Sequence, residues 1–415
     1  MIHFNKFTLD NGLRVIVHED HTTPMAVLDV MYDVGARDEN PEKTGFAHLF
    51  EHLMFGGSIN IPEYDEPLQM AGGENNAYTT NDFTNYYIQL PAENIETAFW
   101  LESDRMLSLA FSEKSLEVQR KVVCEEFKEH YINKPYGDVH ANLRALAYTT
   151  HPYKWMTIGK ELSHIENARL QDVKDFFFKH YRPVNAVLCV AGNVTTEQVK
   201  QLAEKWFGDI PAGEKYERHL PQEPTQTAPR SKEMKAKVPL DALYKAFHIY
   251  SRLDPRYYAA DLVSDVLSGG SSSRLHQSLV KEQQLFSNIE AYHYGSNDAG
   301  LFLIEGKLVK GVKMEDAEKA LNAELQKLQE TIIPERELNK VKNRVESMLA
   351  FEDMSLMSRA NNLAFYELLG DINLMNNEFE NYEKVTVEDI LEQSKIIFNP
   401  NNTNTLYYYA DGSIS

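Results

Sequence analysis

The chain has 415 residues, of which 43% are hydrophobic, and a formal net charge of -20 at pH 7. This length exceeds one ordinary hydrophobic core, so we expect two domains. The negative charge argues against nucleic acid and against an anionic membrane as partners, and no apolar run approaches the length of a membrane span.

The cysteines and the N-terminus bear on the compartment. Cys124 and Cys189 are the only cysteines, which is no disulfide framework and suits a reducing environment. Residues 1–6 contain no apolar signal core and lead at once into a strand pattern. We therefore expect a cytoplasmic protein, unless a leader has been trimmed.

The hydrophobic pattern predicts strands and helices throughout the first half. Strands at 13–17 and 26–34 precede a helix that Asn40 or Thr44 can cap and that ends at Gly56. Farther along, we expect strands through 86–90 and at 186–192, and helices at 92–110, 112–133, 138–148, 170–180 and 195–207.

The helix before Gly56 carries a metal-binding pattern. His48 and His52 are four residues apart and lie on one helical face, where neutral imidazoles can share a zinc ion. Glu51 stands beside them and can act as the base for a zinc-bound water. A chance match on a surface helix is the alternative. The surrounding apolar residues indicate a buried helix, in which three polar side chains are costly unless they are paired or bind metal.

Catalytic zinc usually takes a third protein ligand, and the helix predicted at 112–133 offers acidic candidates. Glu126 follows Val122 and Val123 on an apolar stripe, which makes it a candidate, whereas Glu125 looks solvated. The other candidates in this helix are Glu117 and Glu129. Helical spacing alone leaves the choice open.

The second half of the chain repeats the first. Shifted by 213 positions, residues 56–58 fall on residues 269–271, and both segments read Gly-Gly-Ser. Under the same shift, the three polar residues of the metal pattern meet Asp261, Ser264 and Asp265. This pattern indicates duplication, with the metal residues in one copy only.

A stretch rich in proline, threonine and charge separates the two copies. Residues 212–231 show little periodicity and are typical of a linker. We therefore expect a zinc-binding domain at 1–211 and a homologous domain without the metal residues at 232–415. Residues 232–237 read as a solvated segment leading into the second domain.

Three other features have ordinary structural interpretations. The Gly-Ser-rich segment 269–274 lacks the lysine of a phosphate loop and is predicted to be a turn. Cys124 has no histidine spaced to activate it, so we expect a core residue. His130 is interpreted as a surface or hydrogen-bonded histidine.

Residues 45–58, together with residues 120–126, resemble the inverted-zincin peptidases, the family of mitochondrial processing peptidase, pitrilysin and insulin-degrading enzyme. The similarity spans nearly the whole chain. It implies an α+β fold of two homologous domains, each an antiparallel sheet packed with helices, arranged as a clamshell around a chamber.

The resemblance also implies a site. Glu126 matches the family's distal ligand, so His48, His52 and Glu126 would bind one zinc ion, with Glu51 as general base. The segment containing Asn76, Ala77 and Tyr78 is similar to the family's exposed edge strand, which pairs with an extended substrate peptide; an ordinary turn entering a strand is the alternative.

Two departures from the family pattern affect this expectation. The position of a second acid, seven residues before Glu126, holds Gln119. Related active enzymes carry an arginine and a tyrosine in the second half, where this chain has Val280 and Ser287. We therefore expect a zinc endopeptidase acting on short or unfolded peptides, as the metal-bearing half of a heterodimer whose related subunit supplies the Arg/Tyr pair. A homodimer and a non-catalytic assembly subunit are the alternatives.

Overall fold

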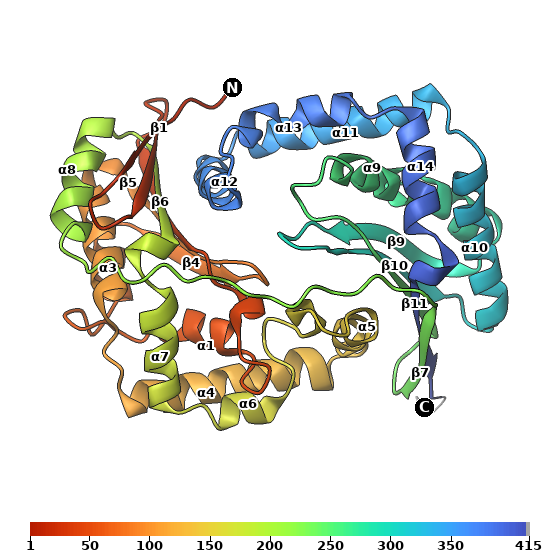
Figure 1. Ribbon diagram of the computed structural model, residues 1–415, viewed down its shortest axis with the longest axis horizontal. Helices are drawn as coiled ribbons and strands as arrows, with labels where there is room; N and C mark the ends of the chain where they lie inside the picture. The colour runs from red at the N-terminus through yellow and green to blue at the C-terminus, as the bar shows by residue number, and fades with distance from the viewer. Residues whose placement is uncertain (412–415) are drawn as a thin grey trace. The chain divides into compact units, whose positions relative to one another are not determined.

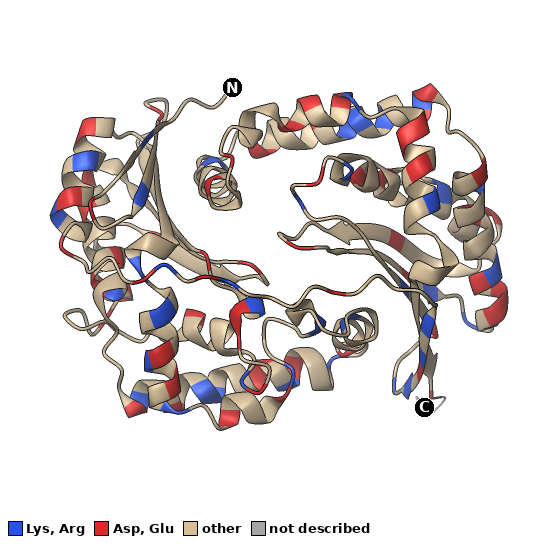
Figure 2. Ribbon diagram, viewed as in Figure 1, with Lys and Arg blue, Asp and Glu red and all other residues tan. Residues whose placement is uncertain are grey.

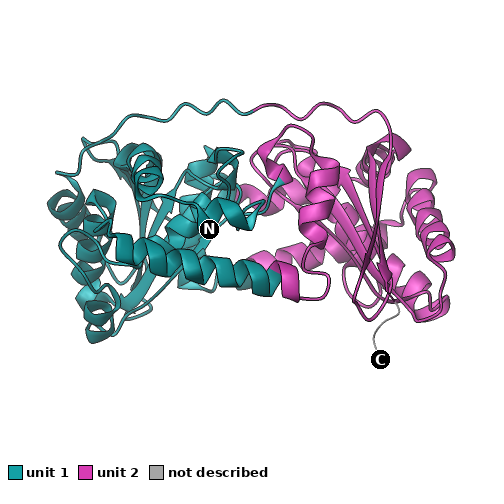
Figure 3. Cartoon of the chain, turned by 90° about the horizontal axis from the view of Figure 1, so that it is seen from below, with its two compact units in different colours: residues 1–130, 155–220, 350–376 teal, residues 131–154, 221–349, 377–415 magenta. Residues whose placement is uncertain are grey.

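The computed structural model describes residues 1–411 and divides into two compact units, shown in Figure 3. Unit 1 comprises residues 1–130, 155–220 and 350–376, and unit 2 comprises residues 131–154, 221–349 and 377–415. Each unit contains one β-sheet and several helices, so the predicted α+β class is confirmed. No described helix combines the length and the apolar character that crossing a bilayer requires.

Unit 1 is built on a six-stranded sheet in the order β1-β2-β6-β3-β5-β4. All neighbouring strands are antiparallel except β2 and β6, which are parallel. β6 is completely buried, as expected for a strand covered on both faces. The strands are β1 (Asn5–Thr8), β2 (Arg14–Glu19), β3 (Met25–Tyr32), β4 (Glu74–Thr79), β5 (Thr84–Pro91) and β6 (Ala186–Gly192).

Most helices of unit 1 come from the first half of the chain. They are α1 (Phe46–Leu53), α2 (Asp65–Met70), α3 (Ile95–Leu107), α4 (Glu113–Phe127), α6 (Leu162–Glu166), α7 (Leu170–His180) and α8 (Thr196–Phe207). The helix predicted at 112–133 is α4 followed by a π-helical turn at Lys128–Asn133. The unit is completed by α12 (Leu356–Leu369), which lies against the sheet in Figure 1.

Unit 2 repeats this design with a five-stranded sheet in the order β7-β11-β8-β10-β9. Its one parallel pair, β7 with β11, corresponds to β2 with β6. The strands are β7 (Arg230–Ala236), β8 (Ala242–His248), β9 (Phe286–Tyr294), β10 (Leu301–Leu308) and β11 (Thr403–Ala410). The helices are α5 (Val139–Ala147), α9 (Tyr257–Ser268), α10 (Met314–Glu330), α11 (Glu335–Glu352), α13 (Leu374–Glu383) and α14 (Val387–Ile397). Both α11 and α13 run across a unit boundary.

Each sheet has one face covered by a helix from the other half of the sequence. Leu363 of α12 packs with Val27 and Val187 in unit 1, whereas Leu143 of α5 packs with Tyr244 in unit 2. Because both faces of each central strand are apolar, each sheet needs a second covering layer. The units therefore differ from the contiguous domains expected at 1–211 and 232–415, because residues 131–154 belong to unit 2 and residues 350–376 belong to unit 1.

The segment expected to be a linker ends in regular structure. Residues 211–228 contain no helix or strand, but β7 begins at Arg230, inside the predicted linker range 212–231. Most of the segment 232–237, expected to be solvated, is this same strand. Its side chains are largely exposed because β7 is an edge strand with one partner, β11.

Candidate metal centre

Helix α1 is held by aromatic packing on the face opposite its polar residues. The Phe50 ring stacks on Phe177 of α7 at 5.8 Å between centroids and lies 4.7 Å from Tyr181. Burial of such rings contributes about 2 kcal/mol or more each. This packing directs His48 and His52 toward α4.

The beginning of α1 depends on a buried carboxyl group. Gly45 adopts a left-handed conformation with a φ of 86° and provides no side-chain cap. Glu39 takes that role, because its oxygens accept hydrogen bonds from the backbone N–H groups of Gly45 and Ala47 and from the Trp155 indole. Burial raises the pKa of Glu39 to about 8, against the opposing effect of these donors. Asn40 and Thr44, expected as caps, do not fill this position.

The end of α1 approaches α4 closely. A Cβ atom at Gly56 would stand 2.4 Å from the hydroxyl oxygen of Ser115, near the start of α4. Glycine at this position therefore allows the two helices to pack side by side, which brings the acidic side chains of α4 within reach of the histidines.

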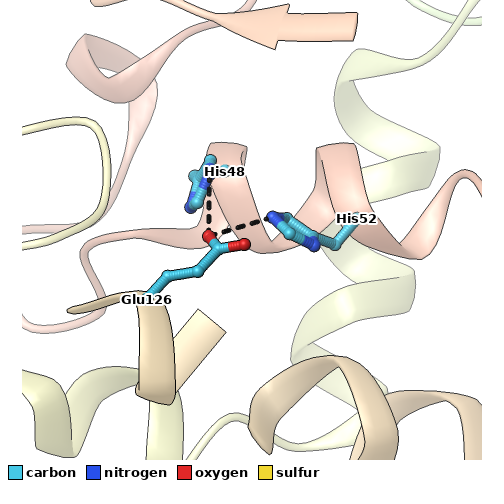
Figure 4. A group of neighbouring side chains, drawn as sticks. All are labelled: His48, His52 and Glu126. Atoms are coloured by element: carbon cyan, nitrogen blue, oxygen red, sulfur yellow. Dashed lines mark ion pairs between the residues drawn. The ribbon is translucent and has the colours of Figure 1, made fainter. Parts of the chain in front are cut away.

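His48, His52 and Glu126 converge in this packing, as Figure 4 shows. Oε2 of Glu126 lies 3.7 Å from Nε2 of His48 and 3.4 Å from Nε2 of His52. Among residues 1–411, this is the one group of three or more metal-binding side chains whose donor atoms fit around a single ion. The histidines and the glutamate come from two different helices.

The donor set fits zinc. Zn–N and Zn–O bonds of about 2.1 Å in a tetrahedral arrangement place neighbouring donor atoms about 3.4 Å apart. Burial, and then the nearby His52, lower the pKa of His48 to about 4, which keeps its imidazole neutral and able to bind metal. The three side chains remain 18–33% exposed, so water or a substrate can reach them. Nδ1 of His48 is buried and has no hydrogen-bond partner in the described part of the chain.

Glu51 lies beside these residues and contacts the edge strand. The hydroxyl of Thr79, the last residue of β4, donates a hydrogen bond of 2.5 Å to Oε2 of Glu51. Burial raises the pKa of Glu51, while the Thr79 hydroxyl and then His52 act in the opposite direction. A base with a raised pKa is better matched to proton transfer near neutral pH.

The other acids of helix α4 point elsewhere. Glu125 pairs with Lys128, and Glu117 pairs with Arg120. Glu129 is exposed in the π-helical turn. The apolar stripe used to predict Glu126 is only partly present, since Val123 is fully buried but Val122 is 40% exposed.

β4 is an edge strand of the unit 1 sheet and ends at this site. The N–H of Thr80 bonds to Phe83 across the hairpin, so strand alternation directs the backbone groups of Asn75, Ala77 and Thr79 toward the free edge. Among the described residues, the N–H of Ala77 bonds only to the Asn76 side chain, at 2.8 Å. The Tyr78 hydroxyl donates a hydrogen bond to Asn361 of α12.

The equivalent positions in unit 2 hold a different arrangement. Asp265 lies 3.3 Å from the Arg344 guanidinium, and Asp261 accepts a hydrogen bond from Tyr382. Val280 packs against the core of the unit, and the Ser287 hydroxyl donates to the Lys307 carbonyl. No residue at these two positions can replace an arginine or a tyrosine.

Cys124, His130 and the Gly-Ser-rich segment have no functional contact in the described residues that would change their structural interpretation. Cys124 is buried and His130 is exposed. The segment 269–273 forms a turn, and the guanidinium of Arg274, the next residue, is paired with Glu337. Sequence reasoning missed Glu39 and Thr79, because neither has a spacing signal relative to the histidines.

Comparisons with known proteins place the chain among peptidases. The family described as "Insulinase (Peptidase family M16)" matches residues 14–161, and "Peptidase M16 inactive domain" matches residues 167–345. The chain is 30% identical to the zinc protease PqqE of Helicobacter pylori over 96% of this chain and 91% of that protein. It is 31% identical to the beta subunit of the mitochondrial-processing peptidase of Saccharomyces cerevisiae, over 50% of this chain and 45% of that one. The crystal structure of a protease from Helicobacter pylori superimposes with a TM-score of 0.92 at 28% identity, covering 98% of this chain and all of that one.

Proposed function

We propose that this chain, which belongs to peptidase family M16, is the metal-bearing subunit of a zinc endopeptidase that cleaves short or unfolded peptides. The observation that carries the proposal is the convergence of His48, His52 and Glu126 beside Glu51. A relative named as a zinc protease supports the choice of metal. The three converging side chains would hold the ion.

In this proposal, the metal and Glu51 carry out different parts of the reaction. A zinc ion held by His48, His52 and Glu126 would supply Lewis acidity, which would activate the attacking water and polarise a peptide carbonyl. Glu51 accepts the proton of the attacking water and delivers it to the leaving amine. Removal of this base is expected to lower turnover by a factor of about 10² or more.

The edge of β4 supplies a place for the substrate backbone. An extended peptide can pair with the outward-facing groups of Asn75 and Ala77, which lie on the strand that leads to Thr79 and Glu51. The N–H of Ala77 would exchange its bond with the Asn76 side chain for one with a substrate carbonyl. In this proposal, the backbone groups of Asn76 and Tyr78 face β5 and do not pair with the peptide.

A related subunit would complete the active site. Val280 and Ser287 offer no charged or phenolic group for a developing oxyanion, a function worth about 3 kcal/mol per donor in hydrolases. We therefore propose a heterodimer whose partner supplies an Arg/Tyr pair. The yeast relative is named as a beta subunit, which agrees with such an assembly.

Metal analysis and two variants test the function. The chain should bind one zinc ion, and His52→Ala should lose it. Glu51→Gln should retain zinc and lose peptide cleavage. Zinc-free wild-type protein would instead favour an assembly subunit, and cleavage by Glu51→Gln would contradict the role of the base.

Copurification tests the partner. The chain isolated from its native source should bring down a related subunit, and peptide cleavage should rise when that subunit is added to the pure chain. Full protease activity of the chain alone would show that no second subunit is needed.

A further inference from the structure

The Glu51 carboxylate has one side-chain hydrogen-bond donor within residues 1–411, the hydroxyl of Thr79. The backbone N–H of Thr79 also lowers the pKa of Glu51. Both donors belong to the last residue of β4, while Glu51 belongs to α1. The contact therefore joins the helix of the metal residues to the edge strand.

A glutamate has three side-chain torsions, and its carboxylate can adopt several positions at similar cost. Proton transfer requires the base to lie within hydrogen-bond reach of the attacking water, and a misplacement of about 1 Å costs roughly 10²-fold in rate. A hydrogen bond to one carboxylate oxygen limits this freedom. This bond is made to Oε2, so the hydroxyl of Thr79 does not occupy the other oxygen, Oε1.

We propose that Thr79 is the positioning residue of the general base, and that it couples the base to peptide binding because it is part of the strand that receives the peptide. The inference rests on the proposed function and extends it to a residue outside the metal pattern. A peptide paired with Asn75 and Ala77 meets Thr79 as the next outward-facing position of the same edge. The strand thus determines both the register of the peptide and the orientation of Glu51.

Two substitutions at Thr79 distinguish a positioning role from a purely structural one. Thr79→Val retains the branched shape and the strand propensity but loses the hydroxyl, whereas Thr79→Ser retains the hydroxyl. In the zinc-loaded enzyme with its partner, Thr79→Val should lower kcat about 10- to 100-fold and leave KM within about twofold. Thr79→Ser should recover kcat to within about threefold. Metal content and the unfolding midpoint should not change in either variant.

A binding measurement gives a readout that does not depend on turnover. A peptide hydroxamate binds zinc and donates a hydrogen bond to the neighbouring carboxylate, so its affinity reports the position of Glu51. Thr79→Val should weaken hydroxamate binding about fivefold in the wild-type background and less than twofold when combined with Glu51→Gln.

The outcomes distinguish this inference from the function on which it rests. Full kcat in Thr79→Val, equal impairment of the Val and Ser variants, or an additive double-mutant cycle would each overturn the positioning role. If Glu51→Gln abolishes cleavage in those cases, the proposed function stands. If the zinc-loaded complex neither cleaves peptides nor binds the hydroxamate, the proposed function fails and the inference falls with it.

Discussion

At the residue scale, two carboxyl groups that are not metal ligands hold backbone N–H groups in place. Glu39 does so at the beginning of α1, and Glu223 does so in unit 2, from within the segment 212–231. Backbone donors that are buried without an acceptor cost about 1–3 kcal/mol each. Both residues are therefore expected to matter for stability although neither touches a substrate.

Removal of Glu39 should weaken the start of the metal helix. Glu39→Ala leaves the N–H groups of Gly45 and Ala47 without an acceptor, so we expect a loss of about 2–4 kcal/mol in the free energy of unfolding. Zinc affinity should fall as well, because His48 lies in the first turn of α1. Denaturant unfolding of the metal-free chain and zinc titration measure the two effects. Glu42→Ala, an exposed neighbour, is the control and should change stability by less than about 0.5 kcal/mol.

Glu223 should make the stability of unit 2 depend on pH. Burial raises its pKa, but the backbone N–H groups of His151, Thr150 and Thr149 together outweigh burial and lower it to about 2. A carboxyl whose pKa is lower in the folded state stabilises the fold above its unfolded value, here 4.5, and this contribution is lost as the pH falls toward 2.

The variant Glu223→Gln tests this linkage. At pH 7, it should unfold about 1 kcal/mol more easily than wild type, a figure reduced for solvent screening because the group is partly exposed. The difference should shrink progressively below pH 4.5 as the wild-type carboxylate takes up its proton. Glu217→Gln, whose carboxylate is exposed in the linker, should match wild type at every pH. A difference that is constant with pH would show that the carboxylate charge is not responsible.

At the scale of elements, local periodicity predicts what lies within one helix and not what packs between two. His48 and His52 could be predicted as a pair because four residues make one turn of the same helix. Glu126 comes from another helix, so spacing alone could not choose among the acids of that helix as the third ligand. Its selection depended on the family resemblance. Thr79 meets Glu51 through the packing of a strand against a helix, which leaves no periodic signal.

The two exchanged helices, α5 and α12, also could not be assigned to their sheets from local periodicity. The apolar run of β6 predicts a strand covered on both faces, and the structure buries all seven of its residues. Which helix covers the second face depends on long-range packing. α12, from the second half of the chain, fills that place in unit 1, and no pattern around Leu363 or Ala364 identifies its sheet.

The free edge of β4 gives a prediction that a pair of proline variants can test. Ala77→Pro removes an N–H that makes no bond to β5, so the sheet should persist while peptide pairing is lost. Asn76→Pro is the matched control, because it removes an N–H that faces β5 and should destabilise unit 1 by about 3 kcal/mol. In zinc-loaded Glu51→Gln protein, Ala77→Pro should weaken binding of a fluorescent peptide about tenfold or more, with unchanged zinc content. Undiminished binding would exclude this edge as the peptide site.

At the scale of the whole molecule, the negative charge is distributed over both units, as Figure 2 shows. It is unevenly distributed in sequence. Residues 44–104, which contain α1 and β4, hold no lysine or arginine but ten acidic residues, namely Glu51, Glu63, Asp65, Glu66, Glu74, Asp82, Glu93, Glu96, Glu102 and Asp104. Several of these acids, such as Glu102 and Asp82, are ion-paired with Arg105 and Arg37 from outside the segment.

Four acids near the start of β4 are exposed and form no ion pair with any described residue: Glu63, Asp65, Glu66 and Glu74. Asp65 accepts a hydrogen bond from Asn75, which places its charge next to the edge of β4. A peptide bound along this edge would therefore lie in a negative potential, which favours basic side chains and is screened by salt beyond about 10 Å at 0.1 M.

We expect the enzyme to prefer basic peptides in a salt-dependent manner. For two peptides of equal length, one with arginines and one with glutamines at the same positions, the basic peptide should show a KM about 3- to 10-fold lower at low ionic strength. Raising the salt concentration to about 0.5 M should remove most of this difference, because the Debye length falls to about 4 Å. Replacing Asp65, Glu66 and Glu74 by their amides should reduce the preference in the same way while kcat and zinc content remain unchanged. Since these three residues lie at the end of β4 opposite Thr79, a preference that survives their replacement would mean that the charge elsewhere in the molecule, and not this strand, selects the substrate.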